Sequence, residues 1–311
     1  MIIYALHENP DWFPPFAAAF DAAGLDYQEW LLIDGVIDLD SAPPEGIYWN
    51  RLSASSHTRD HAHAKDYTRA LLDWLEAHGR RVVNGRMVVE MEVSKVRQLS
   101  ALRAFGIDVP KTIAVVGTSD LMAAAERMPS PFITKHNQGG KGLGVRRFDD
   151  LDAFAAYVDS DEFEQPVDGI TLLQEYVRPR DGFITRVETV GYEYIYAISA
   201  DAARGGFQLC PADACELDSA GRPIEAASLF ALREGYWHPV IEQFLAFARR
   251  YQIEIAGFEF IETDDGRIVT YDVNTNTNYN PDVEAIAPKS GPAEIARYLQ
   301  RVQDEVYAQV R

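Results

Sequence analysis

The chain has 311 residues, of which 47% are hydrophobic and 25% are charged, as expected for a globular protein of two or three domains. Its formal net charge of −19 argues against sequence-independent binding to nucleic acid or to an anionic membrane, since both need a basic surface. The sequence has neither a signal-peptide pattern at its start nor an apolar run long enough to span a bilayer. The only cysteines, Cys210 and Cys215, cannot form a disulfide framework, so we expect a cytoplasmic protein.

The first part of the chain, residues 1–93, alternates between strand and helix patterns. Short runs of apolar and β-branched residues predict strands, and two amphipathic runs that end at Gly24 and Gly79 predict helices. The expected strands are 1–6, 27–33, 46–50 and 81–84, and the expected helices are 13–24 and 64–79. This βαβ pattern predicts a small parallel sheet.

The rest of the chain predicts two further blocks, 94–170 and 171–311. The middle block is expected to contain helices 94–106 and 119–128 and strands 111–116, 131–135 and 144–148. The last block has the longest strand patterns, together with helices near 237–250 and 292–308. Its expected strands are 171–177, 183–191, 193–200, 254–262 and 267–274.

The last two strands predict a hairpin with an acidic face. They flank the pair Asp265-Gly266, which favours a two-residue turn and would pair Thr263 with Ile268. The same register places Glu259 directly opposite Asp272. Like charges in that position destabilise a sheet, unless a cation lies between them.

Asn274 follows two residues after Asp272, so the alternation of a strand places it on the same face. Two carboxylates and an amide are hard oxygen ligands of the kind that magnesium prefers. The hairpin alone leaves a solvated polar face open as the alternative.

A glycine-rich loop in the middle block has the composition of an anion-binding loop. Residues 132–148 run from a strand that ends near Lys135, through Gly140, Lys141 and Gly142, into a second strand. Glycines allow backbone amides to approach an anion closely. The loop is not a Walker A motif, because Gly142 follows Lys141, and it is not a dinucleotide fingerprint, because no helix follows. We interpret it as a flap over phosphates; a flexible surface hairpin is the alternative. Protein kinases also place a glycine-rich loop between two strands, but their catalytic-loop and metal motifs are absent from this sequence.

Taken in order, these features resemble the ATP-grasp superfamily, and within it the carboxylate–amine ligases, which include ribosomal protein S6 glutamate ligase and glutathione synthetase. The resemblance extends over residues 94 to about 280. Lys95, with its helix and the GI-x-x-P-x-T strand entry, is similar to the first lysine of the family. Lys135 and the glycine flap are similar to the second, and residues 172–177 are similar to the hinge that reads adenine.

The resemblance implies a fold, an activity and a set of site residues. The implied fold is α/β of the α+β ATP-grasp kind, with a small parallel domain at 1–93 and two ATP-grasp subdomains at 94–170 and 171–311. The implied activity uses ATP to convert a carboxylate into an acyl phosphate, which an amine attacks to form an amide. The expected partners are Mg²⁺, with Mn²⁺ as the other candidate, and small carboxylate and amine substrates such as an amino acid or a short peptide.

The implied nucleotide-binding residues are Lys95, Lys135, Gly140, Lys141, Gly142, Gln174, Glu175, Tyr176 and Val177. The implied metal ligands are Glu259, Asp272 and Asn274, and the implied catalytic residues are Arg186 and Asn276. Arg186, Asn276 and Asn278 are also implied to bind substrate. Arg51 joins this last group on other grounds, since it follows strand 46–50 at the end where α/β folds bind ligands. A surface arginine is the alternative for Arg51.

Two departures from the family concern the substrate rather than ATP. Relatives often carry a basic residue where this chain has Asp201, and residues 202–232 match no family pattern, although Arg204 could supply a charge.

The histidines of HTRDHAH (57–63) have spacings that permit metal binding, but a loop leading into a helix accounts for them more simply. An ATP-grasp kinase that phosphorylates a hydroxyl, and a nucleotide-binding module without catalysis, remain the competing functions. The oligomeric state stays open.

Overall fold

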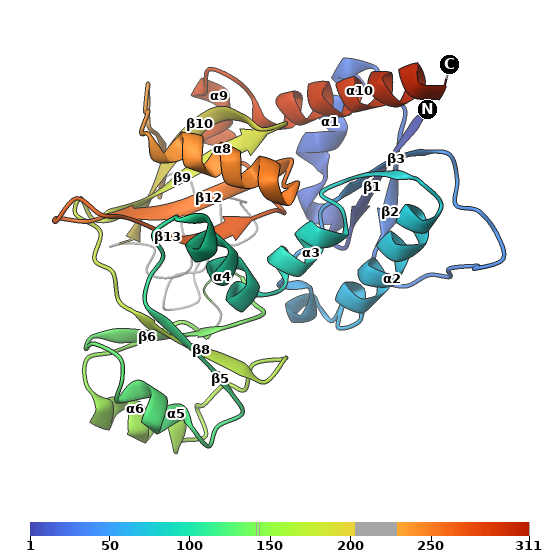
Figure 1. Ribbon diagram of the computed structural model, residues 1–311. Helices are drawn as coiled ribbons and strands as arrows, with labels where there is room; N and C mark the ends of the chain where they lie inside the picture. Colours follow the sequence, from blue (N-terminus) through green and yellow to red (C-terminus); the bar gives the residue numbers. More distant parts are fainter. Residues whose placement is uncertain (141, 143, 203–228, 311) are drawn as a thin grey trace.

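The computed structural model describes residues 1–140, 142, 144–202 and 229–310, which form three sheets and the helices that cover them (Figure 1). The expectations for Lys141, Arg204, Cys210 and Cys215 fall outside these residues. No helix within the described ranges is both long and apolar enough to cross a membrane.

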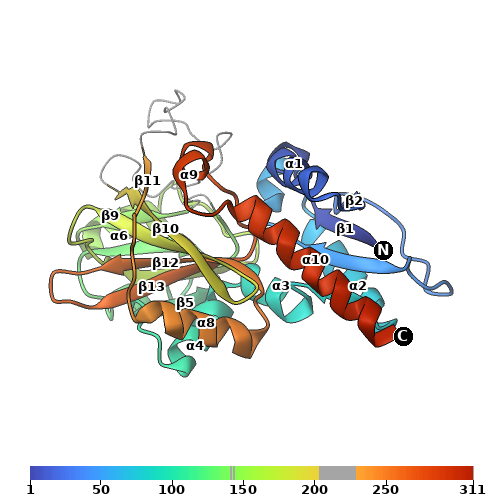
Figure 2. The same cartoon turned by 90° about the horizontal axis from the view of Figure 1, so that it is seen from above.

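The N-terminal sheet is parallel, with strand order β2-β1-β3-β4, which confirms the βαβ prediction. Its strands are β1 (Ile2–His7), β2 (Tyr27–Leu31), β3 (Gly46–Asn50) and β4 (Arg81–Val83). Helix α1 (Pro14–Ala23) covers one face, and α2 (Ala64–Ala77) and α3 (Arg86–Glu92) cover the other (Figure 2). Both faces of β3 are therefore buried, which accounts for its continuous apolar run.

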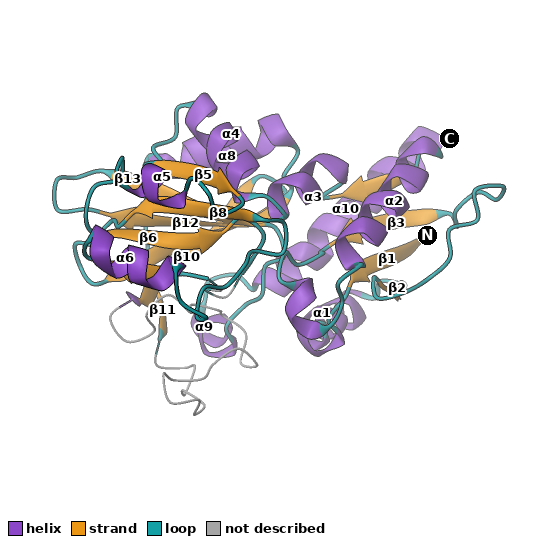
Figure 3. Cartoon of the chain, turned by 90° about the horizontal axis from the view of Figure 1, so that it is seen from below, coloured by secondary structure: helices purple, strands orange, loops and turns teal. Residues whose placement is uncertain are grey.

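The middle sheet is antiparallel, with strand order β5-β8-β6-β7. Its strands are β5 (Thr112–Val116), β6 (Phe132–His136), β7 (Arg146–Phe148) and β8 (Ile170–Glu175). Helices α5 (Leu121–Ala125) and α6 (Leu151–Val158) pack on its outer face (Figure 3). Helix α5 is shorter than the expected 119–128 at both ends: it begins after Asp120, whose side chain forms no capping hydrogen bond, and it ends at Ala125.

The five-stranded sheet is antiparallel and has the order β11-β10-β9-β12-β13. Its strands are β9 (Phe183–Val190), β10 (Glu193–Asp201), β11 (Phe230–Leu232), β12 (Ile255–Glu262) and β13 (Ile268–Asn274). Helices α4 (Lys95–Phe105) and α8 (Val240–Tyr251) bury one face of β12. The short helix α9 (Pro281–Ile286) follows β13.

The last helix, α10 (Gly291–Val310), leaves the five-stranded sheet and packs along α1, over the N-terminal sheet (Figures 1 and 2). Ile295 and Leu299 of this helix share one apolar core with Phe16 and Trp49 of the N-terminal part and with Ile198 of β10. The boundaries 1–93, 94–170 and 171–311 stay a prediction. By its contacts, however, α10 completes the N-terminal layer.

Candidate active site

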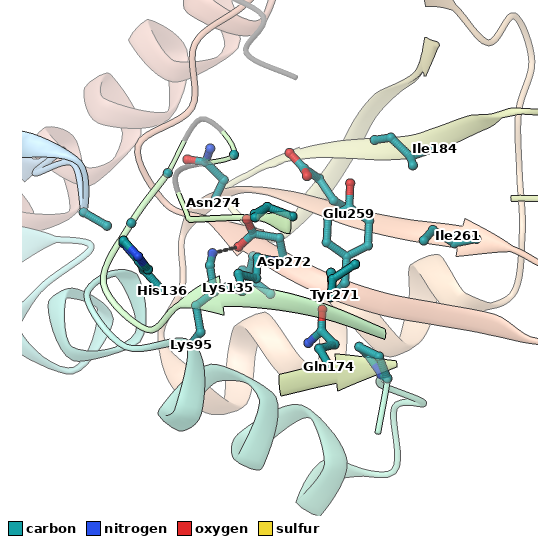
Figure 4. Close-up of a pocket in the computed structure, with 18 of the residues that line it drawn as sticks. Lys95, Lys135, His136, Gln174, Ile184, Glu259, Ile261, Tyr271, Asp272 and Asn274 are labelled. Carbon is teal, nitrogen blue, oxygen red and sulfur yellow. Dashed lines mark hydrogen bonds and ion pairs between the residues drawn. The ribbon is translucent and has the colours of Figure 1, made fainter. Parts of the chain in front are cut away.

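A pocket of about 390 Å³ lies between the middle sheet and the five-stranded sheet, and loops of the N-terminal sheet close one end of it (Figure 4). Thirteen predicted site residues line this pocket: Lys95, Lys135, Gly140, Gly142, Gln174, Glu175, Tyr176, Val177, Glu259, Asp272, Asn274, Asn276 and Asn278. Among the predicted site residues that the structure describes, only Arg51 and Arg186 do not line it.

The turn of the β12–β13 hairpin differs from the prediction. Glu262, and not Thr263, pairs with Ile268, so the register near the turn is displaced by one residue. The Thr263 N–H donates to the Arg267 carbonyl at 3.1 Å, and Gly266 has a φ of 83°. A three-residue loop that ends with a left-handed glycine therefore replaces the expected two-residue turn.

A β-bulge restores the predicted pairing at the acidic face. The register shifts between Glu259 and Phe260, and Tyr271 is the extra residue on β13, so Glu259 lies opposite Asp272 as predicted. The bulge also lets consecutive residues Tyr271 and Asp272 both face the pocket. The predicted neighbourhood of Glu259 and Asp272 is therefore confirmed, although the predicted turn is wrong.

Two lysines lie beside Asp272: Lys95, which is buried, and Lys135, which is partly buried. The Lys95 ammonium forms an ion pair with the Asp272 carboxylate, and Lys135 lies 5.1 Å from the centre of the Tyr271 ring (Figure 4). Burial, reinforced by the neighbouring Lys95, lowers the pKa of Lys135 to about 8, although Asp272 and Glu259 act in the opposite direction. Burial disfavours charge on Asp272 too, but Lys95 and Lys135 outweigh that effect and hold its pKa below the usual value.

Arg186 lies behind the carboxylates rather than in the pocket. Its guanidinium is 2% exposed and donates to Glu188 and, at 3.0 Å, to Glu259. Its Nη2 has no hydrogen-bond partner within the described structure. Gly257 makes this position possible, because a Cβ there would lie 2.6 Å from Nε and Nη2 of Arg186.

The predicted hinge forms the apolar end of the pocket. The backbone N–H groups of Glu175 and Tyr176 are bonded to the carbonyls of Lys111 and Pro131, at 2.9 and 3.3 Å. No described residue accepts a hydrogen bond from the Val177 N–H. Ile133, Ile261 and Val269 also line the pocket.

The glycine flap contacts the N-terminal part of the protein. Lys65, which is 5% exposed on α2, donates to the Gln138 side chain at 2.8 Å. The neighbouring Gly140 is so close to Ser55 that a Cβ at Gly140 would lie 3.5 Å from the Ser55 Cβ. The flap in this structure therefore lies against the loop that follows β3.

Arg51 is buried rather than at the surface, with 2% of its area exposed. Its Nη2 donates to the Thr277 carbonyl at 3.2 Å and to Asn278 Oδ1 at 3.0 Å. The guanidinium also lies 4.3 Å from the centre of the Phe16 ring. Burial lowers the pKa of Arg51 to about 10, which leaves it charged at neutral pH.

The histidines of residues 57–63 do not meet. His57 contacts Lys65 at 3.2 Å, and His61 contacts Glu8 at 3.0 Å. Across the described residues, no group of three or more His, Cys, Asp or Glu side chains could hold a metal ion. The candidate metal site thus consists of two carboxylates and the Asn274 amide.

Sequence reasoning missed several pocket residues. Trp12, Ser53 and Ser55 come from loops at the carboxyl ends of β1 and β3, where the rule that suggested Arg51 would also have found them. Glu92 ends α3, accepts from the Ala54 N–H at 3.1 Å and accepts from Thr275 at 2.8 and 2.9 Å. No local pattern marks Glu92, because its partners are distant in sequence.

Comparisons with known proteins show which chains this one is similar to. No family model matches the chain. Ribosomal protein bS6–L-glutamate ligase of Shigella boydii is 24% identical over 245 residues, which are 78% of this chain and 74% of that protein. The crystal structure of D-cycloserine synthetase DcsG matches with a TM-score of 0.65 and 17% identity, over 96% of this chain and 99% of that one.

A third match is the ATP-grasp ligase PsnB, whose structure was solved with a phosphomimetic variant of its minimal precursor, Mg and ADP. It has a TM-score of 0.61 and 15% identity, over 96% of this chain and 97% of PsnB. The chain therefore has the ATP-grasp fold and resembles, in sequence and in structure, the carboxylate–amine ligases of that superfamily.

Proposed function

We propose that this enzyme is an ATP-dependent carboxylate–amine ligase that forms an amide bond through an acyl phosphate. One observation carries the proposal: a single pocket brings together Glu259, Asp272 and Asn274, the two lysines Lys95 and Lys135, and a glycine flap. The sequence similarity to a glutamate ligase supports the ligase class over a kinase.

The chemistry of the donors fits Mg²⁺. Two carboxylates and an amide oxygen from adjacent strands would hold it, and they leave room for water and phosphate oxygens. When bound, Mg²⁺ supplies charge that offsets the negative phosphates of the nucleotide. Lys95 and Lys135 add positive charge on the same side of the pocket.

The nucleotide base fits the apolar end. The unpartnered Val177 N–H is suited to an acceptor nitrogen of adenine, and Ile133 and Ile261 would pack on the two faces of the ring. The flap residues Gly140 and Gly142 line the same pocket, and Gly140 lies beside Ser55 of an N-terminal loop; there they would cover phosphates and exclude water.

The substrates fit the opposite, polar end. Asn276 and Asn278 supply amides there, and Trp12 and Ser53 come from the N-terminal part. We assign to Arg186 a supporting role: buried behind Glu259 and outside the pocket, it donates to the Glu259 carboxylate at 3.0 Å and would hold that carboxylate in place beside the reacting phosphate. The substrates are an amino acid or short peptide that supplies the carboxylate and a second such molecule that supplies the amine.

The test is ADP release with pooled amino acids, followed by mass spectrometry of the products. We expect ADP release that depends on the added amine, and products whose mass equals that of the two joined substrates less one water. An Asp272→Ala, Asn274→Ala variant should lose on the order of 10²-fold in rate. The matched control is Asp264→Ala, since Asp264 is exposed at the turn of the same hairpin. A phosphorylated product that forms without amine would instead support the kinase, and unchanged ADP release in the double variant would refute the metal assignment.

A further inference from the structure

The loop between β13 and α9, residues 275–280, forms the polar end of the pocket. Asn276 and Asn278 face the pocket. Asn276 is 5% exposed, and its Oδ1 has no hydrogen-bond partner in the described structure. Thr277 and Asn280 are buried as well. A polar loop of this kind needs external contacts to keep one conformation, because its own sequence forms neither helix nor strand.

Hydrogen bonds hold the start and the centre of the loop. At its start, the Thr275 N–H and hydroxyl donate to Glu92 at 2.9 and 2.8 Å, and the Asn276 N–H donates to Asn274 Oδ1 at 3.1 Å. In its centre, Arg51 donates to the Thr277 carbonyl and to Asn278 Oδ1. Arg51 thus connects the N-terminal sheet to the residues that follow the candidate metal ligand.

The electrostatic setting of Arg51 is unusual for a structural arginine. A buried guanidinium normally lies against a carboxylate, because an uncompensated buried charge is costly. Within the described residues, Arg51 forms no ion pair, and the nearby Glu8 is already bonded to Arg59 and His61. The charge is instead compensated by neutral oxygens of the loop and by the Phe16 ring.

We propose that Arg51 is a positioning residue of the ligase: it fixes Thr277 and Asn278, so that Asn276 and Asn278 are preorganised for the amino-acid substrate. The proposal rests on the proposed function for its substrate class. Arg51 acts through the loop and not by contact with the substrate, because it does not line the pocket. Preorganised polar groups bind a substrate without first paying the entropy of ordering themselves.

The direct test is hydrogen exchange of the amides in residues 275–280, measured by mass spectrometry on the whole protein. Arg51→Met removes the guanidinium but keeps an unbranched side chain that packs on Phe16. The matched control is Arg81→Met, since Arg81 also leaves the N-terminal sheet and bonds a residue of the last block, Glu254. We expect faster exchange in residues 275–280 for Arg51→Met alone. Exchange equal to that of the wild type, or equal acceleration in the control, would overturn the proposal.

The second readout separates positioning from general damage. ADP release is measured against the concentration of pooled proteinogenic amino acids, and MgADP affinity is measured by calorimetry. For Arg51→Met we expect the apparent KM for the pool to rise about tenfold, with kcat and MgADP affinity changed less than about threefold. A loss of MgADP affinity as large as the rise in KM, or an unchanged KM despite faster exchange, would refute it.

A conservative variant completes the experiment. Arg51→Lys should raise KM less than Arg51→Met does, because an ammonium keeps a charged donor near the loop but cannot reproduce both bonds of Nη2. A higher KM for Arg51→Lys than for Arg51→Met would count against these bonds as the cause. If the wild type forms no amide with any amino acid, the proposed function fails, whereas the exchange experiment still decides whether Arg51 orders the loop.

Discussion

The space beside Gly257 makes a sharp prediction about the support of the candidate metal site. A Cβ at Gly257 would lie 2.6 Å from Nε and Nη2 of Arg186 and 2.7 Å from Cζ. Gly257 is not among the residues with positive φ, so alanine fits the backbone, and the three nearest atoms that its Cβ would meet all belong to Arg186. Gly257→Ala therefore isolates the effect of displacing one buried guanidinium.

The magnitude follows from the geometry. Ordinary contacts of a Cβ begin near 3.4 Å, so the guanidinium must retreat by about 0.8 Å. Such a shift strains the bonds to Glu188 and Glu259, and no solvent is near to replace them, because Arg186 is buried. Overpacking and the weakened ion pairs together should lower the free energy of unfolding by about 2–4 kcal/mol.

Urea unfolding of four proteins tests this reasoning: the wild type, Gly257→Ala, Arg186→Lys, and the double variant. A lysine ammonium is smaller than a guanidinium, so the alanine should cost less than about 1 kcal/mol when Arg186 is already lysine. The Gly257→Ala variant should also lose most of its ADP release, since Glu259 shifts with its partner. An alanine variant as stable and as active as the wild type, or fully additive effects in the double variant, would refute the argument.

Three further predictions concern stability. Asn84→Ala should lower the free energy of unfolding by about 2–4 kcal/mol, because the buried Asn84 amide bonds the backbone of Glu254 and joins the N-terminal sheet to β12; urea unfolding measures it. Burial lowers the pKa of Lys65 to about 8, from an ordinary value of 10.5 in the unfolded chain. Between these two pKa values the unfolded chain binds more protons than the folded protein, so wild-type stability should rise as the pH increases through this range. Urea midpoints at pH 7.5 and 9.5 should show a smaller rise in Lys65→Met. In scanning calorimetry without nucleotide, a chelator should leave Tm unchanged, whereas Lys95→Met should lower Tm because Lys95 already compensates the charge of Asp272. A Tm that falls with the chelator but not with Lys95→Met would show that the fold depends on a metal.

Most regular elements could be predicted from the sequence because their signals are local. The apolar runs at 46–50 and 254–262 became β3 and β12, and helices α1 and α4 end at Gly24 and Gly106, both in the left-handed conformation. The missed elements are short or weakly patterned. Helix α9, for example, begins with Asn280 as its cap and Pro281 as its first residue, a start signal hidden in an asparagine-rich run.

The residues contributed by the N-terminal part could not be found by local patterns. Ser53 and Ser55 reach the pocket because the parallel sheet ends there, and Glu92 does so because it joins two loops far apart in sequence. The bulge at Tyr271 is likewise a property of strand pairing. The sequence specified that two carboxylates belong together, but not the loop length and bulge that bring them there.

The structure also changes the physical reason why those carboxylates are tolerated. Glu259 and Asp272 lie opposite each other on adjacent strands, and the sequence suggested that a cation between them could offset their repulsion. In the structure each has its own cation from a different element: Arg186 of β9 for Glu259, and Lys95 of α4 for Asp272. Because these cations belong to the chain, the acidic face can be stable before any ligand binds. Lys95 then has two candidate anionic partners, the Asp272 carboxylate and the phosphates of a nucleotide. If the phosphates replaced Asp272 as the partner of Lys95, the Asp272 carboxylate would become free to bind the metal that arrives with the nucleotide.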